Sequence, residues 1–121
     1  MKKVLIVDDA AFVRLAIKEI LAKIGSIEFV EAVNGLDAVK KYIETKPDIV
    51  TMDITMPDMT GMEALKLIRK VDSEAKVIMI TAMGQDTMVK EAVLNGAKSF
   101  IIKPFKEEHV ISTVKKLLEV L

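Results

Sequence analysis

Short apolar runs and helical spacings of apolar residues alternate along the whole chain. Val4 to Val7 form the first apolar run, which is typical of a strand buried on both faces. After Asp8 and Asp9, apolar residues recur at helical spacing, and Gly25 ends that pattern. We expect the buried face of this first helix to consist of Phe12, Leu15, Ala16, Ile20 and Ile24.

The same alternation continues through four more strands, each a short apolar or mixed run next to turn-forming residues. Asn34 is suited to cap the second helix, and Pro47 ends it. The expected strands lie at residues 27–33, 49–52, 76–80 and 99–102. The expected buried face of the second helix is Leu36, Val39 and Ile43.

The remaining helices carry recognisable start and end signals. Thr60 and Glu63 match a capping box, which predicts a helix that continues to about Lys70. Gln85 or Asp86 begins the fourth helix, which ends at Asn95 and Gly96. The last helix has an apolar stripe formed by Val110, Ile111, Val114, Leu117, Leu118 and Leu121.

Five strand–helix units predict an α/β protein: a doubly wound parallel sheet with helices on both faces, joined by right-handed crossovers. Five units are too few for an eightfold barrel. The first, third and fourth strands are the most apolar and belong in the centre. The second strand carries Glu28 and Glu31, and the fifth is short, so both belong at edges. The predicted five-stranded sheet has the order 2-1-3-4-5.

Polar residues follow four of the strands at the point where each strand ends. They are Asp8 and Asp9 after the first strand, Asp53 after the third, Thr81 after the fourth and Lys103 after the fifth. In a parallel sheet all of these ends lie at one edge, and ligands bind beside the strands where the winding reverses. We therefore expect three carboxylates to converge beside a hydroxyl and an ammonium group.

Each of these residues also has a plainer interpretation. Asp8 or Asp9 alone can be the cap of the first helix, and Asp53 alone can begin a turn. Thr81 alone is an ordinary strand-end residue, and Lys103 before a proline is the end of an edge strand. The joint placement of all of them at strand ends favours a functional site.

Three carboxylates that lie this close repel one another, so the cluster needs a cation. Oxygen ligands suit a hard ion, which predicts Mg²⁺, with Mn²⁺ as a substitute. A metal, a carboxylate nucleophile, a lysine and a hydroxyl together suit phosphoryl transfer, which depends mainly on positioning and charge neutralisation. Asp53 is the expected nucleophile because its strand is central.

Composition narrows the range of partners and compartments. Lys and Arg number 18, as do Asp and Glu, so no net charge attracts nucleic acid or an anionic membrane. The chain has no cysteine, which excludes disulfide scaffolds, thiolate metal sites and cysteine nucleophiles. No apolar run is long enough to span a bilayer, and the N-terminal apolar run is too short for a signal peptide. We expect a cytoplasmic monomer.

Four segments together resemble the receiver domain of two-component response regulators over essentially the whole chain. They are Val-Asp-Asp at 7–9, Met-Asp-Ile-Thr-Met-Pro-Asp-Met-Thr-Gly at 52–61, Thr-Ala-Met-Gly at 81–84 and Lys-Pro-Phe at 103–105. The resemblance implies a flavodoxin-like fold and a single receiver domain over residues 1–121 without an output domain. The chain is similar above all to the stand-alone receivers of chemotaxis.

The resemblance also implies roles for particular residues. Asp53 is the expected phosphoacceptor. Asp9, Asp53 and the backbone carbonyl of Thr55 are the expected direct magnesium ligands, and Asp8 is expected to bind the ion mostly through water. Thr81 and Lys103 are expected to contact the phosphoryl oxygens. The Lys103–Pro104 peptide is expected to be cis.

Two further pairs of residues are expected to tune the response. Thr81 and Phe100 form the expected switch; many chemotaxis receivers have a tyrosine where this chain has Phe100. Thr55 and Met83 are expected to flank the path of the attacking water. Neither side chain can orient water with a carboxylate or an amide, which predicts slow self-dephosphorylation.

The expected function is a phosphorylation-activated switch rather than a conventional enzyme, although the domain would catalyse its own phosphorylation and autodephosphorylation. The implied partners are a CheA-like histidine kinase, a FliM-like motor switch or adaptor protein, and a separate phosphatase. The expected output surface is the fourth helix, the fifth strand and the fifth helix. A phosphorelay shuttle is the alternative within the same family.

Other classes fit particular residues less well. An aspartyl-nucleophile phosphatase needs a second Asp two positions after the nucleophile, where this chain has Thr55. A flavodoxin binds phosphate after the first strand, where Asp8 and Asp9 would repel it. The chain has neither a Walker lysine loop nor a Gly-x-Gly-x-x-Gly motif. His109 is expected to be a solvated helix residue, and the methionines near the site either pack in the core or form a rim that limits water.

Overall fold

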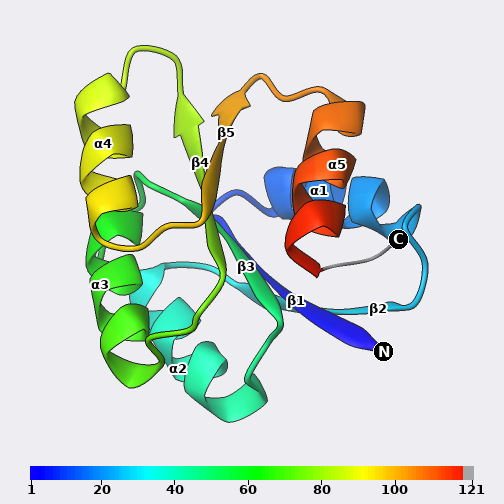
Figure 1. The fold of residues 1–121 in the computed structure, drawn as a ribbon, viewed down its shortest axis with the longest axis horizontal. Coiled ribbons are helices and arrows are strands. Elements are labelled where there is room, and N and C mark those ends of the chain that lie inside the picture. The colour runs from blue at the N-terminus through cyan, green and yellow to red at the C-terminus, as the bar shows by residue number, and fades with distance from the viewer. Residues whose placement is uncertain (119–121) are drawn as a thin grey trace.

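The computed structural model describes residues 1–118, in which strands and helices alternate strictly (Figure 1). The first half of the chain contains β1 (Lys2–Val7), α1 (Ala11–Ala22), β2 (Ile27–Ala32), α2 (Gly35–Thr45) and β3 (Ile49–Asp53). The second half contains α3 (Gly61–Val71), β4 (Val77–Ala82), α4 (Asp86–Leu94), β5 (Ser99–Lys103) and α5 (Glu107–Leu118). None of the helices in this part of the chain has the length and hydropathy that a membrane crossing requires.

The five strands form one parallel sheet in the order β2-β1-β3-β4-β5. This order confirms the prediction, including the edge positions of β2 and β5. The winding reverses between β1 and β3, which are hydrogen-bonded neighbours. The carboxyl ends of the strands therefore meet at one edge, as a doubly wound sheet requires.

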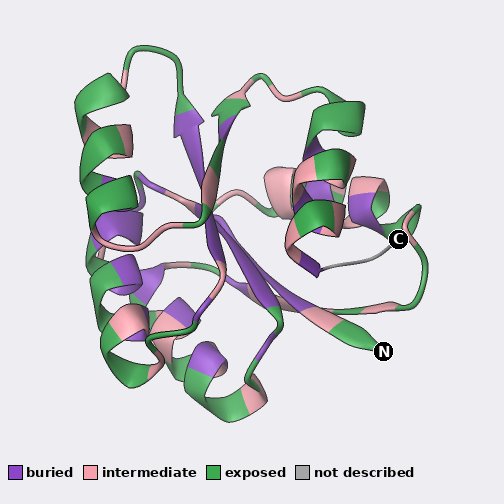
Figure 2. Cartoon of the chain, viewed as in Figure 1, coloured by how far each residue is buried: buried purple, intermediate pink, exposed green. Residues whose placement is uncertain are grey.

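Side chains of successive strand residues point to opposite faces, and each face builds its own core. On one face, Leu5 and Val7 of β1 pack with α2, α3 and α4. On the other face, Val4 and Ile6 pack with α1 and α5. Figure 1 shows the two groups of helices on opposite sides of the sheet, and Figure 2 shows the central strands as the most buried part of the molecule.

The predicted buried face of α1 was wrong in part. Phe12 is 77 % exposed and Leu15 is exposed as well, whereas Ile17 and Leu21 are buried. Ion pairs account for this orientation of the helix, because Lys18 directly follows the buried Ile17 and Arg14 lies one turn earlier on the same side as Lys18. Both bond to Glu31 of β2, with Arg14 Nε at 2.9 Å and Lys18 Nζ at 2.8 Å.

The predicted face of α2 was wrong in the same way. Leu36 and Ile43 are exposed, and the buried positions include Ala38 and Tyr42. The Tyr42 hydroxyl donates a hydrogen bond of 2.7 Å to Asp72 Oδ2 at the end of α3. A tyrosine can be buried when its hydroxyl finds such a partner, so the alternative stripe, one residue away, faces the core.

The predicted helix starts of α2 and α3 are confirmed. Asn34 Oδ1 accepts a hydrogen bond from Asp37 N, and Thr60 and Glu63 form the capping box. In α5, Val110, Val114 and Leu118 are buried as expected, and Ile111 and Leu117 are partly buried. Leu121, the last member of the predicted stripe, lies outside the described residues.

Gly61 begins α3 in direct contact with the backbone of the strand end that precedes it. Its N–H donates to Ile54 O at 2.8 Å. A Cβ atom at this position would lie 2.0 Å from the carbonyl oxygen of Asp53 and 2.9 Å from Ile54 Cα. Only glycine allows this approach, which fixes the loop between β3 and α3.

We predict that Gly61→Ala destabilises the protein by about 3 kcal/mol, because the contacted atoms belong to the backbone and cannot move aside. Urea unfolding measures the change. The matched control is Gly25→Ala, where a Cβ meets nothing within 4 Å and only the positive φ of 83° is strained. The control should cost about 1–2 kcal/mol. Equal losses for both variants would contradict the proposed contact.

Candidate functional site

The carboxylates of Asp8, Asp9 and Asp53 lie together at the carboxyl edge of the sheet. An oxygen from each can be chosen so that all three lie within 4.8 Å of one another. Asp8 and Asp9 follow β1 directly, and Asp53 is the last residue of β3. The pairing of β1 with β3 brings them together, which confirms the predicted convergence.

Alternation along the strands decides which face each side chain occupies. Asp53 follows Ile49 by four residues and Lys103 follows Ile101 by two, so both share the face packed against α1 and α5. Asp8 follows Ile6 by two and shares that face as well. Thr81 follows Met79 by two and belongs to the opposite face, packed against α2, α3 and α4.

Lys103 is the cation of this cluster. Its Nζ lies 3.2 Å from Asp53 Oδ2, to which it donates a hydrogen bond, and 3.6 Å from Asp8 Oδ2. One ammonium thus bridges the ends of β1, β3 and β5. Its single charge leaves the three carboxylates with a net negative charge.

Asp8 is the most buried of the three carboxylates, with 1 % of its surface exposed. Burial raises the pKa of its carboxyl, while the Ala10 N–H bond of 2.9 Å and the Lys103 charge act in the opposite direction. Within the described residues, its Oδ2 atom has no hydrogen-bond donor. A buried carboxylate oxygen without a donor, beside two further carboxylates, fits a divalent cation.

Asp53 is held at the mouth of the site by two contacts. Besides Lys103 at Oδ2, the backbone N–H of Thr55 donates to Oδ1 at 3.3 Å. These contacts leave the carboxylate at the entrance of the cluster, partly accessible to a reacting group. The expected role of the Thr55 carbonyl as a metal ligand stays a prediction.

Thr81 lies at the edge of the site, and its hydroxyl is turned to another partner. It donates a 2.6 Å hydrogen bond to Gln85 Oε1. In the part of the chain that the structure describes, no hydrogen bond joins Thr81 to Asp53. The predicted contact between Thr81 and a phosphoryl oxygen therefore requires Thr81 to leave Gln85.

The residues expected to tune the response differ in exposure. Met83 is 75 % exposed, and Thr55 is exposed as well. Met56, Met59 and Met62 pack in the core. Phe100 is 40 % exposed.

Phe100, the expected switch aromatic, lines a surface hollow beside β5. The volume of this hollow is about 320 Å³. The Lys103–Pro104 peptide next to it is cis, as the resemblance implied. His109 is exposed and lies outside the acidic cluster. The hollow is lined by Phe100, Ile102, Pro104, Phe105, Lys106 and His109.

Sequence reasoning missed Arg14 and Gln85. Arg14 NH1 donates to the backbone carbonyl of Asp8 at 2.7 Å, which anchors the turn after β1. The sequence predicts for Gln85 only a place at the start of the fourth helix, but its side chain contacts both Thr55 and Thr81. The only signal in the sequence was its position four residues after Thr81.

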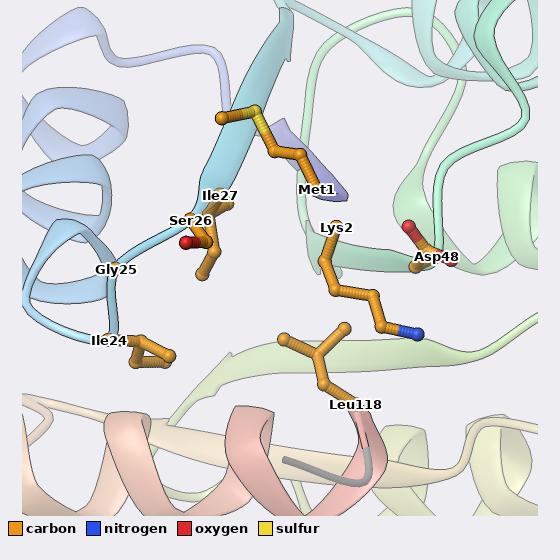
Figure 3. Close-up of a pocket in the computed structure, with 8 residues that line it drawn as sticks. All are labelled: Met1, Lys2, Ile24, Gly25, Ser26, Ile27, Asp48 and Leu118. Atoms are coloured by element: carbon orange, nitrogen blue, oxygen red, sulfur yellow. The ribbon is translucent and has the colours of Figure 1, made fainter.

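A hollow of about 500 Å³ lies at the other end of the sheet, where the strands begin (Figure 3). Lys2 begins β1 and Ile27 begins β2, so this hollow is on the amino edge, away from the acidic cluster. The acidic cluster and Lys103 lie at the carboxyl edge, so we place the candidate site there and not at this hollow. The lining residues in Figure 3 are Met1, Lys2, Ile24, Gly25, Ser26, Ile27, Asp48 and Leu118.

Comparison with known proteins agrees with this geometry. The sequence profile of the response regulator receiver domain matches residues 4–115. The chain is 55 % identical to the chemotaxis protein CheY of Thermotoga maritima over 116 residues, which are 96 % of this chain and 97 % of that protein. It is 53 % identical to the chemotaxis protein CheY of Bacillus subtilis, with the same shares covered.

A solved structure from Borrelia burgdorferi, described as a complex of CheX with CheY, BeF₃ and Mg²⁺, is similar with a TM-score of 0.89 and 39 % identity. The match covers 97 % of this chain and 89 % of that one.

We predict that a divalent cation raises the melting temperature, because it binds the folded cluster and not the unfolded chain. At a free cation concentration of about 100 times its Kd, the free energy of unfolding increases by about 2.7 kcal/mol. Asp9→Asn should remove most of it. Glu19→Gln, at an exposed acid of α1, is the matched control and should keep the full gain. An unchanged response in Asp9→Asn would place the ligands elsewhere.

Proposed function

The chain belongs to the response regulator receiver family, and on that premise we propose that Asp53 is the residue that accepts the phosphoryl group. A receiver is a phosphorylation switch, and its similarity to CheY proteins at 55 % and 53 % identity implies chemotaxis signalling. One observation carries the proposal: Lys103 bridges Asp8 and Asp53 in a cluster that also holds Asp9.

The proposed reaction moves a phosphoryl group from a histidine of a kinase to Asp53. A carboxylate oxygen of Asp53 attacks phosphorus as the phosphorus–nitrogen bond breaks, and the leaving electron pair stays on the imidazole. Lys103, which already contacts Asp53 Oδ2, balances the charge of a phosphoryl oxygen. Later attack by water returns inorganic phosphate and the free carboxylate.

Asp8, Asp9 and Asp53 are the proposed ligands of Mg²⁺, together with the Thr55 carbonyl. Mg²⁺ prefers oxygen ligands, keeps several waters and binds through one or two carboxylates plus a phosphate oxygen. When bound, it neutralises charge on the carboxylates and on the incoming phosphoryl oxygens. The Oδ2 atom of Asp8 accepts no hydrogen bond within the described residues and has the Lys103 ammonium only at 3.6 Å, which supports this assignment.

The proposed switch begins at Thr81 and ends at Phe100. A phosphoryl group adds about two negative charges beside the end of β4, and the Thr81 hydroxyl moves to donate to it. Register places Thr81 opposite Ile102 and Met79 opposite Phe100, so Thr81 and Phe100 share one face of the sheet. Inward movement of Thr81 leaves space that the Phe100 ring can fill.

The proposed partners follow from the same premise. A CheA-like histidine kinase supplies the phosphoryl group, and a FliM-like motor switch or adaptor binds the surface of α4, β5 and α5. A separate phosphatase ends the signal, in line with the CheX found on the Borrelia burgdorferi CheY. Thr55 and Met83 are the proposed residues beside the path of the attacking water. Neither orients that water strongly.

We predict that acetyl phosphate and Mg²⁺ add one phosphoryl group to the protein, as an acyl phosphate that hydroxylamine cleaves. Intact mass measures the adduct. Asp53→Ala should lose it, because the nucleophile is gone. Asp58→Ala, at an exposed acid of the following loop, is the matched control and should keep it. A hydroxylamine-labile adduct on Asp53→Ala at the wild-type rate would disprove the assignment.

We predict that Phe100→Tyr makes ring 100 more exposed before activation, because the added hydroxyl favours the solvated position. Burial of the phenyl ring is worth about 1.5–3 kcal/mol, so the inward state of the wild type is appreciably populated. Broadening of the ring protons by a soluble paramagnet measures exposure with and without beryllofluoride and Mg²⁺.

On activation, the exposure of ring 100 should change more in Phe100→Tyr than in the wild type. Phe12→Tyr, at a ring that is already exposed and lies on α1, should show none. Equal changes in Phe100→Tyr and the wild type would contradict the mechanism.

A further inference from the structure

Gln85 joins the two loops that border the phosphorylation site. Its Oε1 accepts hydrogen bonds from Thr81 Oγ1 at 2.6 Å and from Ala82 N at 2.9 Å. Its Nε2 donates to Thr55 Oγ1 at 3.3 Å. The backbone N–H of Ala82 can only donate, so the amide oxygen must face it and the orientation of the amide is fixed. One side chain therefore ties the end of β4 to the loop after β3.

These bonds occupy the one proton that Thr81 can donate. A hydroxyl has a single O–H donor, and the short bond to Gln85 uses it. The other acceptor near Thr81 Oγ1 is the Ala82 carbonyl at the longer distance of 3.3 Å. A phosphoryl oxygen on Asp53 must compete with Gln85 for this proton.

The start of α4 shows that Gln85 is not there as a helix cap. Gln85 occupies the N-cap position, but its side chain makes no capping hydrogen bond. Asn34 and Thr60 both cap their helices with their side chains. At α4 the side chain contacts Thr81 and Thr55 instead, so the helix has no side-chain cap and its N-cap residue is tied to the site.

We propose that Gln85 is a positioning residue that holds Thr81 in its unphosphorylated position, an inference that rests on the proposed function of Asp53. Phosphorylation breaks the bond from Thr81 to Gln85 and frees the N-terminus of α4 from the site. The bond lowers the affinity of the site for a phosphoryl oxygen and couples Thr81 to the output surface. A ligand shifts this equilibrium only through its different affinity for the two positions of Thr81.

Beryllofluoride with Mg²⁺ is the probe, and amide shifts in ¹H–¹⁵N spectra report its binding. Gln85→Met keeps the side-chain length and removes every hydrogen bond of the amide. It should bind the probe about 2- to 10-fold more tightly, the range expected when one competing hydrogen bond is lost. Gln85→Ala should do the same. Thr87→Val, at an exposed position in the first turn of α4, should match the wild type.

A second background separates positioning from a general effect on structure. In Thr81→Val no hydroxyl competes, so Gln85→Met should give no gain in affinity. The same gain in both backgrounds, or no gain in either, would overturn the role of Gln85. If the wild type itself fails to bind beryllofluoride, the proposed function of Asp53 fails first and the inference falls with it.

Discussion

Repulsion among the carboxylates of Asp8, Asp9 and Asp53 is the unfavourable interaction that the rest of the structure has to overcome. Holding three carboxylates within 4.8 Å of one another, one of them buried, costs free energy unless a cation neutralises them. The free energy that offsets this cost comes from apolar packing elsewhere in the molecule. The two apolar cores on opposite faces of the sheet hold β1 beside β3, whatever the charges at their ends.

Lys103 offsets only part of this repulsion. Its ammonium contacts Asp53 and Asp8 from the edge strand β5, which β4 separates from β3, and leaves a net negative charge. A site neutralised completely by protein groups would gain little from a divalent cation. Incomplete neutralisation therefore fits the divalent cation that we propose for this cluster.

The sequence predicted the sheet order and the site because both depend on strong, local signals. Buried parallel strands are apolar throughout, so a polar residue such as Asp53 marks the strand end, and topology then gathers the ends. The faces of α1 and α2 were harder, since each helix contains two apolar stripes offset by one residue. The choice was made by distant partners, Glu31 for Arg14 and Asp72 for Tyr42. Sequence spacing does not contain that information.

The same limit explains why Gln85 was missed and why it matters. Its contacts join residues 4 and 30 positions away, and the contact with the larger sequence separation exists only after β3 and β4 have paired.

Asp53 and Lys103 occupy one face of the sheet at its edge, whereas Thr81 and Phe100 occupy the other. In the switch that we propose, a signal that starts at Asp53 has to cross the sheet. Thr81 is suited to this crossing, because its hydroxyl can exchange an acceptor on the α4 side for one at the site. The bond from Thr81 to Gln85 would be lost at the start of α4, which is one element of the proposed output surface.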